Sequence, residues 1–258
     1  MNLIKSLGFW GSVLVALSMV SNGSLRADSN ASFIELRTFK IDTKEQHQLV
    51  ADFLADAVVP ALKRAKIGPV GVFKEKQPSE SLDIMLVIPF DSLEEAGHLG
   101  QILSEDYAFG ADGRDYLMAP KSSPAFGRQT TAWFKAFDEF PWLKAPVKSK
   151  ERFFELRVYA SHSEIKGMLK VEMFNEGEIE IFNRVGLNGV FYGQAVVGGN
   201  LPNLTYMLGF DSEEAHKKAW DGFRKDSQWQ QMRTMERYKD TVSKIDKTFL
   251  VPLRGSQI

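Results

Sequence analysis

The chain contains no cysteine, which excludes disulfide bonds, thiolate-ligated zinc, iron–sulfur clusters and thiol catalysis. It has only four histidines, so a histidine-rich metal site is not expected. It also lacks a basic excess, because 32 Lys and Arg residues face 33 Asp and Glu residues, and this balance argues against nucleic-acid binding. What remains is a globular composition, 44% hydrophobic over 258 residues, enough for one large domain or two smaller ones.

Residues 1–27 have the pattern of an export signal. Lys5 supplies the positive start, residues 7–20 form the apolar core, and Leu25-Arg26-Ala27 gives an acceptable cleavage end. The alternative is an uncleaved membrane anchor, which needs about 20 apolar residues. This run is shorter and is interrupted by glycine and serine. We therefore expect cleavage, a periplasmic or extracellular location, and no membrane attachment of the mature chain.

The rest of the chain repeats itself. The segment FIELRTF at 33–39 returns as FFELRVY at 153–159, an offset of 153 − 33 = 120. Phe-Asp-Ser at 90–92 returns at 210–212 with the same offset, and Gly-Val-Phe at 71–73 returns at 189–191 with a slip of two residues. Blocks in register predict a duplication. We divide the chain into a signal (1–27), a tail (28–32), a first unit (33–140), a linker rich in proline and lysine (141–150) and a second unit (151–258).

Each unit predicts the element order β-α-β-β-α-β. Thr43 and Ser161, each followed three residues later by Gln or Glu, are expected to cap the first helices. Pro60 predicts a kink, and Gly68 and Gly186 predict helix ends. In the first unit, strands are expected from 71 and over 82–90 and 128–137, with a second helix capped at 91–92. In the second unit, strands are expected from 189 and over 204–210 and 246–253, with a second helix capped at 211–212. The order is that of the ferredoxin-like, α+β motif.

A four-stranded sheet with helices on one face leaves its other face bare. We therefore expect the two tandem units to pack sheet to sheet, as an α/β-barrel formed within one chain. Side chains alternate along a strand, so Ile34 and Leu36 share a face, which we expect under the helices. The opposite face, toward the space between the sheets, carries Glu35, Arg37, Glu155, Arg157 and Tyr159.

Those five residues are the candidate ligand-binding set. A partly buried carboxylate and guanidinium can hold a small polar ligand, with Tyr159, Tyr192 and Tyr206 as polar-tipped neighbours. The favoured alternative is structural, with each Glu paired to an Arg across the interface of the sheets. His162 has no oriented acid or oxyanion hole near it, and His216 beside two lysines predicts a solvated helix face. No catalytic residue, metal site or cofactor is therefore predicted.

These residues resemble the NIPSNAP family of the dimeric α/β-barrel superfamily. The second unit carries the resemblance best, in FFELRVY, Phe174-Asn175-Glu176-Gly177, the Gly209–Ser212 turn and Asp226-Ser227-Gln228-Trp229. The first unit departs, with Tyr107 and Phe109 near the position of Trp229. The resemblance implies the barrel fold. The superfamily includes haem peroxidases, small monooxygenases and isomerases, but the NIPSNAP branch implies no particular reaction.

Two functions remain open. The first is an exported protein without catalysis that binds a small molecule or a protein partner at the cavity between the sheets or at its rim, as a monomer or a homo-oligomer. The alternative is a small barrel enzyme of the monooxygenase, isomerase or haem-dependent type, acting on an apolar or aromatic substrate. The first is favoured, because the sequence shows no arrangement of acid, base or metal ligands. A Soret band in the purified protein would favour the second.

Overall fold

A computed structural model describes residues 28–30 and 32–258, so the predicted export signal lies outside the described residues. The first half contains β1 (Asp28–Asn30), β2 (Phe33–Lys40), α1 (Lys44–Phe53), α2 (Val59–Arg64), β3 (Gly71–Glu75), β4 (Ile84–Phe90), α3 (Leu93–Glu105), α4 (Tyr107–Asp112), α5 (Arg114–Leu117), β5 (Arg128–Ala136) and β6 (Trp142–Lys144). The second half contains β7 (Phe153–Ala160), α6 (Glu164–Met173), α7 (Ile179–Val185), β8 (Asn188–Val197), β9 (Asn203–Phe210), α8 (Glu213–Lys225), α9 (Ser227–Met232) and β10 (Lys244–Pro252).

The larger sheet is a closed antiparallel barrel with the strand order β10-β3-β4-β2-β5-β8-β9-β7. The first half contributes β3-β4-β2-β5 and the second contributes β8-β9-β7-β10. The two sets join along both edges, where Val251 pairs with Lys74 and Phe134 pairs with Ala195. Closure leaves no edge of this sheet unpaired. The expected α+β barrel is confirmed as a closed eight-stranded barrel.

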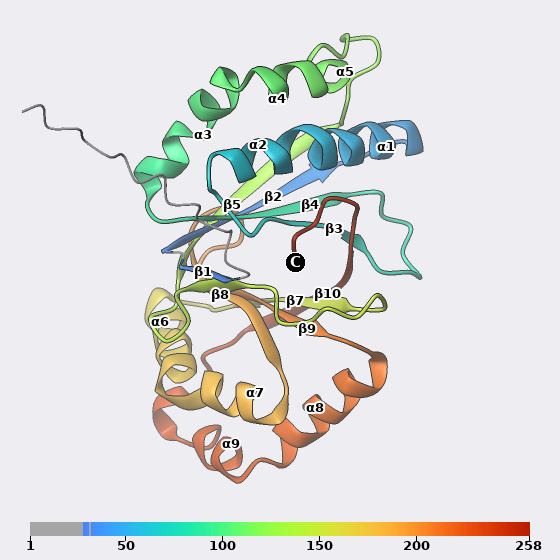
Figure 1. Cartoon of the computed structure of the whole chain (residues 1–258). Helices are drawn as coiled ribbons and strands as arrows, with labels where there is room; N and C mark the ends of the chain where they lie inside the picture. Colours follow the sequence, from blue (N-terminus) through green and yellow to red (C-terminus); the bar gives the residue numbers. More distant parts are fainter. Residues whose placement is uncertain (1–27, 31) are drawn as a thin grey trace, which may run out of the picture.

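Helices cover the barrel on two opposite sides (Figure 1). Helices α1 to α5 lie over the strands of the first half, and α6 to α9 lie over those of the second. Side-chain caps fix where several of them begin. The Thr43 hydroxyl accepts the N–H of Gln46 at 3.2 Å, as predicted, and Ser92 and Ser212 cap α3 and α8 in the same way at 3.1 Å.

Three details of the helices differ from the prediction. The cap of α6 is Ser163, since Ser161 instead donates its hydroxyl to the carbonyl of Thr241 at 2.7 Å. A π-helical turn, Leu54–Val58, stands between α1 and α2, so Pro60 falls at the start of a new helix, where its missing N–H is harmless. Gly186 ends α7 with a φ of 86°, as predicted, but α2 ends at Arg64, with Ala65 as its C-cap, before Gly68.

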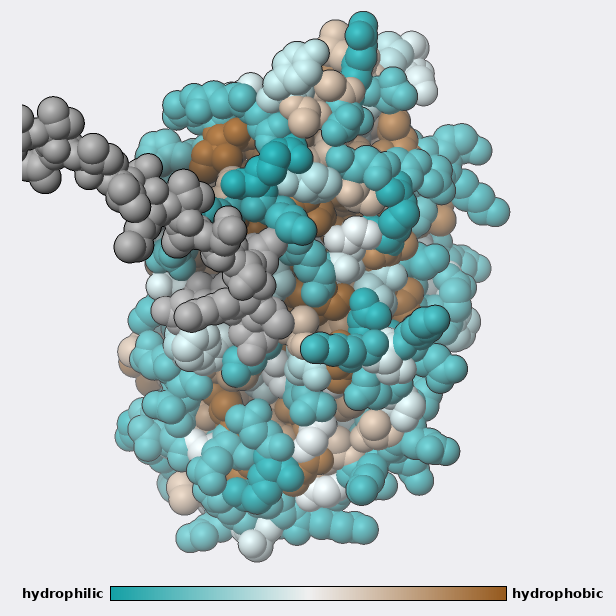
Figure 2. Space-filling view, viewed as in Figure 1, coloured by the Kyte–Doolittle hydropathy of each residue, from teal (hydrophilic) through white to brown (hydrophobic). Residues whose placement is uncertain are grey.

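The segment predicted as a linker is a packed part of the structure. Within it, β6 pairs with β1 of the N-terminal tail, and Leu143 and Val147 are buried in the barrel interior. No helix among the described residues is long and apolar enough to cross a membrane. The face shown in Figure 2 is mostly hydrophilic, with small separate hydrophobic areas.

Candidate functional site

The barrel interior is filled by apolar side chains. Each of the eight strands contributes to one buried cluster, through Ile34, Phe73, Val87, Phe134, Phe154, Phe191, Met207 and Leu250. The C-terminal residue Ile258, 1% exposed, belongs to the same cluster, and the chain end lies between the two helical layers in Figure 1. The space in which we expected a ligand is therefore occupied by the protein itself.

The five predicted ligand-binding residues lie on the opposite, helix-facing side of the barrel wall. On β2, Ile34 points into the barrel, whereas Phe39 packs in the core beneath α1 and α2. Glu35 and Arg37 share the face of Phe39 by alternation. The prediction of an inter-sheet position is thus wrong for Glu35, Arg37, Glu155, Arg157 and Tyr159. The physical reason is that the closed interior offers no water to a charge, whereas the helix-facing side supplies donors and partial exposure.

Glu155 is the centre of a hydrogen-bonded cluster under α8. Its Oε1 accepts from Arg157 Nε at 2.8 Å, within the same strand and not across the sheets as expected. Its Oε2 accepts from Trp220 Nε1 at 2.8 Å and lies 3.0 Å from His216 Nε2. Burial raises the pKa of Glu155, but the bond from His216, the charge of Arg157 and the bond from Trp220 outweigh burial and hold the pKa below its ordinary value. The carboxylate is charged and fully paired.

Glu35 has the same position on β2 with fewer donors. Its Oε1 accepts from Arg37 Nε at 2.7 Å, and its side chain is 1% exposed. Its Oε2 is buried and has no hydrogen-bond partner among residues 28–30 and 32–258. The neighbouring strands place Ile88 and Trp133 opposite Glu35. The carboxylates of Glu35 and Glu155, at equivalent positions in the two halves of the barrel, therefore differ in the number of hydrogen bonds that they accept.

A cavity of about 360 Å³ lies beside Arg157, between the outer face of the second-half strands and helices α6, α8 and α9. Its lining is basic and aromatic, with Arg157, Lys170, Arg224, Arg233, Glu178, Tyr159, Trp220, Phe223 and Trp229 among its residues. The guanidinium carbon of Arg157 lies 3.9 Å from the centre of the Trp220 ring. A volume of this size accommodates a small molecule. We call this space the Arg157 cavity; of the five predicted residues, it includes Arg157 and Tyr159.

A buried ion pair forms one wall of the Arg157 cavity. Lys170 Nζ lies 2.6 Å from Glu178 Oε2, and the two side chains are 5% and 2% exposed. The π-helical turn Phe174–Glu178 holds more residues per turn than an α-helix and brings Glu178 onto the side of Lys170. The ammonium group also lies 4.8 Å from the Phe174 ring centre and 5.5 Å from that of Trp229. Burial raises the pKa of Glu178, although Lys170 opposes the shift.

Sequence reasoning missed Lys170 and Glu178, but the repeat contained a signal for both. The residues 120 positions earlier are Val50 and Val58, both buried in the core beneath α1 and α2. A charged residue that stands in one half of the chain where the other half has an apolar core residue is a candidate for a functional role. Lys170 and Glu178 are such replacements.

Two tyrosines extend the polar network inward, and a third stacks against its end. The hydroxyls of Tyr159 and Tyr206 lie 2.8 Å apart, and Arg157 donates to Tyr159 at 3.1 Å. The ring of Tyr192 stacks on that of Tyr206, with centroids 5.6 Å apart, and its buried hydroxyl has no partner among the described residues. Burial raises the pKa of Tyr192 and of Tyr206. The network runs without a break from Glu155 through Arg157 and Tyr159 to Tyr206.

The histidines divide into different environments. His216 contacts Glu155 and packs against Phe210, with ring centroids 4.7 Å apart, so the predicted solvated position is wrong for it. His47 Nδ1 lies 2.8 Å from the carbonyl oxygen of Leu82. Within the described ranges, no group of three His, Asp or Glu side chains is placed to hold a metal ion.

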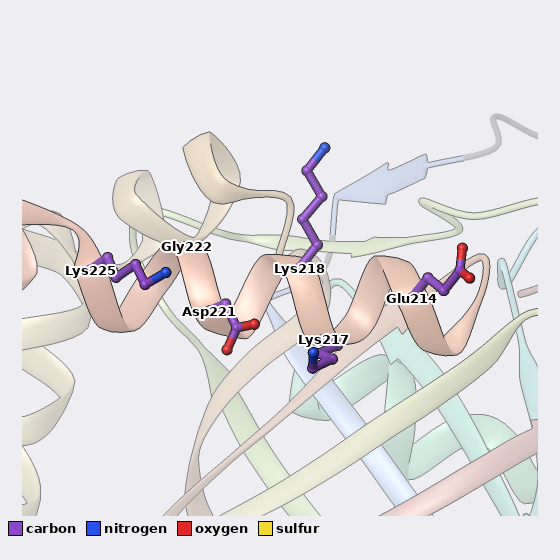
Figure 3. Close-up of a pocket in the computed structure, with 6 residues that line it drawn as sticks. All are labelled: Glu214, Lys217, Lys218, Asp221, Gly222 and Lys225. Carbon is purple, nitrogen blue, oxygen red and sulfur yellow. The ribbon is translucent and has the colours of Figure 1, made fainter.

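A second hollow lies on the exposed face of α8. Its lining consists of Glu214, Lys217, Lys218, Asp221, Gly222 and Lys225. Figure 3 shows these side chains pointing in different directions along the helix, with Lys217 and Lys218 on opposite sides. Since the charges do not converge on one point, this hollow is a solvated helix surface and not a binding site.

The fold defines a class of protein, the α+β proteins with a closed eight-stranded antiparallel barrel. A proposed monooxygenase from Lactobacillus acidophilus NCFM is similar in structure, with a TM-score of 0.58 at 8% identity over 88% of this chain and 98% of that one. A proposed monooxygenase from Fusobacterium nucleatum gives a TM-score of 0.54 at 8% identity over 86% of this chain and 93% of that one. At these identities the likeness shows the fold alone.

Residues 154–257 of the chain form a NIPSNAP domain, matched by the profile of that family. A NIPSNAP family protein from Agrobacterium tumefaciens is among the solved structures found, with 19% identity over 41% of this chain and 96% of that one, at a TM-score of 0.37. A search of curated proteins finds no significant match. The matched domain includes the Arg157 cavity and all of its lining residues.

Proposed function

We propose that the NIPSNAP domain binds a small molecule with a negative charge and an aromatic body, and that the Arg157 cavity is its site. The observation that carries the proposal is the presence of two cations with little exposure at the cavity wall: the side chain of Lys170 is 5% exposed and that of Arg157 is 14% exposed. Two further cations, Arg224 and Arg233, line the same space, against the single carboxyl of Glu178.

The chemistry of the lining supports this ligand class. A guanidinium and an ammonium group bind carboxylate or phosphate oxygens by charge-assisted hydrogen bonds, which strengthen where water is excluded. The rings of Trp220 and Trp229 provide flat apolar walls for the body of the ligand. The Tyr159 hydroxyl adds a polar contact that can orient it. The ligand is thereby held between helices and sheet, and not between the two sheets.

Titration with benzoate and 2-naphthoate tests the proposal, followed by calorimetry and by quenching of tryptophan fluorescence. We expect saturable binding that is tighter for naphthoate, because it covers more apolar surface. The double variant Lys170→Met/Glu178→Gln removes both members of the buried Lys170–Glu178 ion pair, so that neither charge is left without its partner. It should weaken binding by tenfold or more. Lys217→Met, at an exposed position of α8, is the matched control. Equal affinity of the double variant and the native chain would refute the site.

A second candidate function is a reaction on the bound ligand. It is favoured by the Tyr159 and Tyr206 hydroxyls, 2.8 Å apart at the inner end of the polar network, where a proton can pass between them. Proteins proposed as monooxygenases share the fold. Oxygen uptake in the presence of 2-naphthol, compared between the native chain and Tyr159→Phe, tests this function. Uptake that does not differ from the rate without protein would argue for binding alone.

We also infer that the two halves arose by duplication and that the chain is exported. The order β3-β4-β2-β5 of the first half matches β8-β9-β7-β10 of the second, and the helices α3 and α8 both have 13 residues. These matches support a common origin. Export rests on residues 1–27 alone. Mass spectrometry of the protein secreted by its own host should find an N-terminus near Asp28, and a retained Met1 would overturn the inference.

A further inference from the structure

The cations that line the Arg157 cavity lie at two depths. Arg157 on β7 and Lys170 on α6 form its inner end, with side chains that are 14% and 5% exposed. Arg224, in the last turn of α8, has a side chain that is 61% exposed, and Arg233, the C-cap of α9, is exposed as well. Both line the same cavity. The cavity therefore has positive charge at its inner end and again at its rim.

The cations of the inner end already have carboxylate partners. Lys170 Nζ lies 2.6 Å from Glu178 Oε2, and Arg157 Nε donates to Glu155 Oε1 at 2.8 Å. Two positive charges thus face two negative charges in a region with little water. A ligand anion at this end shares the cations with those carboxylates, and a second anion there would be repelled by them. The inner end therefore suits one acidic group.

Arg233, at the rim, is different. The other arginines of this helical layer, Arg184, Arg224 and Arg237, each form an ion pair with an Asp or Glu side chain. Among the residues that the structure describes, no carboxylate is paired with Arg233, although its side chain lines the cavity. The positive charge of Arg233 is therefore available to a ligand that reaches the rim.

A row of aromatic rings connects the inner end to the rim. The Trp220 ring lies over Arg157, 3.9 Å from its guanidinium carbon. The ring centroids of Trp220 and Phe223 are 5.7 Å apart, and those of Phe223 and Trp229 are 4.3 Å apart. The Arg233 N–H donates to the carbonyl of Trp229 at 2.9 Å, so Arg233 lies one helical turn beyond the last ring. A flat apolar body can follow this row from one set of cations to the other.

We propose that the ligand of the Arg157 cavity is an elongated aromatic dianion, with one acidic group at each end, and that Arg233 selects for the second group. This inference rests on the proposed function. Arg157 and Lys170 bind the inner acid, the aromatic row covers the body, and Arg233 binds the outer acid. Discrimination between a monoanion and a dianion therefore depends on the rim of the cavity.

Calorimetric titration of the full chain with 2,6-naphthalenedicarboxylate and with its monomethyl ester tests this inference. The two ligands share a ring system and have nearly the same shape, but only the diacid carries a charge at both ends. We expect the diacid to bind about fivefold more tightly, which is the scale of one exposed ion pair. Because salt screens exposed charges, the two affinities should approach each other as NaCl is raised to about 1 M.

Variants of Arg233 locate the effect. Arg233→Gln should bring the affinities of the diacid and the ester to within about twofold, whereas Arg233→Lys keeps the charge and should retain most of the difference. Lys225→Gln is the matched control. It removes one positive charge from the exposed surface of α8 at a residue that does not line the Arg157 cavity, so the ratio of the two affinities should not change.

Equal affinities of the diacid and the ester for the native chain would overturn the inference. A difference that Arg233→Gln leaves intact, or that Lys225→Gln lowers equally, would overturn it too. If the ester binds and the second charge adds nothing, the proposed function stands and only the dianion is wrong. If neither ligand binds, the proposed function fails as well.

Discussion

The indole N–H of Trp220 donates a hydrogen bond of 2.8 Å to Oε2 of Glu155, joining α8 to β7. Trp220 is 7% exposed and Glu155 is 1% exposed, so water does not replace this donor freely. The bond therefore has two consequences. It stabilises the charged carboxylate, and it sets the Trp220 ring as one wall of the Arg157 cavity.

Replacing Trp220 by Phe tests the first consequence. The ring remains and the N–H is lost, so we expect a loss of about 1–3 kcal/mol in the free energy of unfolding. Urea denaturation of both proteins measures it. Trp229→Phe is the matched control, because no hydrogen bond from the Trp229 indole is present in the described structure. A control as destabilised as Trp220→Phe would show that ring size, not the N–H, is responsible.

Replacing Arg37 or Arg157 by Met should have unequal effects. Arg37 is the only side-chain donor to Glu35 among the described residues, so Arg37→Met leaves a buried carboxylate bare and should cost about 3–5 kcal/mol. Glu155 keeps Trp220 and His216 after Arg157→Met, and we expect about 1–3 kcal/mol there. Chemical denaturation of the two variants gives the comparison. The reverse order of stability would contradict the hydrogen-bond assignment.

The lowered pKa of Glu155 predicts how stability depends on pH. A carboxyl whose pKa is lower in the folded state contributes stability above its ordinary pKa, near 4.5, and loses that contribution as the pH falls through the folded-state pKa. Glu155→Gln removes the contribution, so its stability deficit should be full at pH 6 and should shrink below pH 4.5. Thermal unfolding across this range measures it. Glu139→Gln, at an exposed position, should show no such trend.

The raised pKa of Glu178 predicts how ligand binding depends on pH. Above that pKa, the charged carboxylate pairs with Lys170 and competes with a ligand anion. As the pH falls below the pKa of Glu178, this carboxyl becomes neutral and no longer competes with the ligand. For each unit by which the bound anion shifts the pKa of Glu178, benzoate should bind about tenfold more tightly, which corresponds to about 1.4 kcal/mol. Glu178→Gln should bind tightly and without this dependence. Calorimetry over a pH series from 4.5 upward separates the two behaviours.

The filled barrel predicts a large effect of shortening its buried side chains. Phe154 and Ile258 are 0% and 1% exposed in the interior cluster, so Phe154→Ala should cost about 3–5 kcal/mol and Ile258→Ala about 2–5 kcal/mol. Leu201, 49% exposed, is the control, and Leu201→Ala should change stability by less than about 0.5 kcal/mol. A near-neutral Ile258→Ala would mean that the C-terminus does not occupy the barrel.

Local features were predictable because they depend on neighbouring residues. Thr43, Ser92 and Ser212 cap helices where a hydroxyl precedes an acidic or amide residue, and a strand starts at Gly71 as predicted. The prediction that Ser161 caps α6 was wrong, because Ser163 offers the same cap two residues later. The Ser161 hydroxyl instead donates to the carbonyl oxygen of Thr241, which is distant in the sequence. Nothing near Ser161 in the sequence encodes that contact.

By itself, the sequence determined the order of the barrel strands and of the main helices between them, and which side chains share a face of a strand, because these follow from local spacing. It did not determine which face turns inward. Strands such as β4 and β9 are buried on both faces, one by side chains of the barrel interior and one by the helices, so alternation alone leaves two equivalent choices. Only the tertiary structure placed Glu155 against Trp220, left Glu35 without such a donor, and brought Lys170 to Glu178, because those contacts depend on how helices far along the chain settle on the sheet.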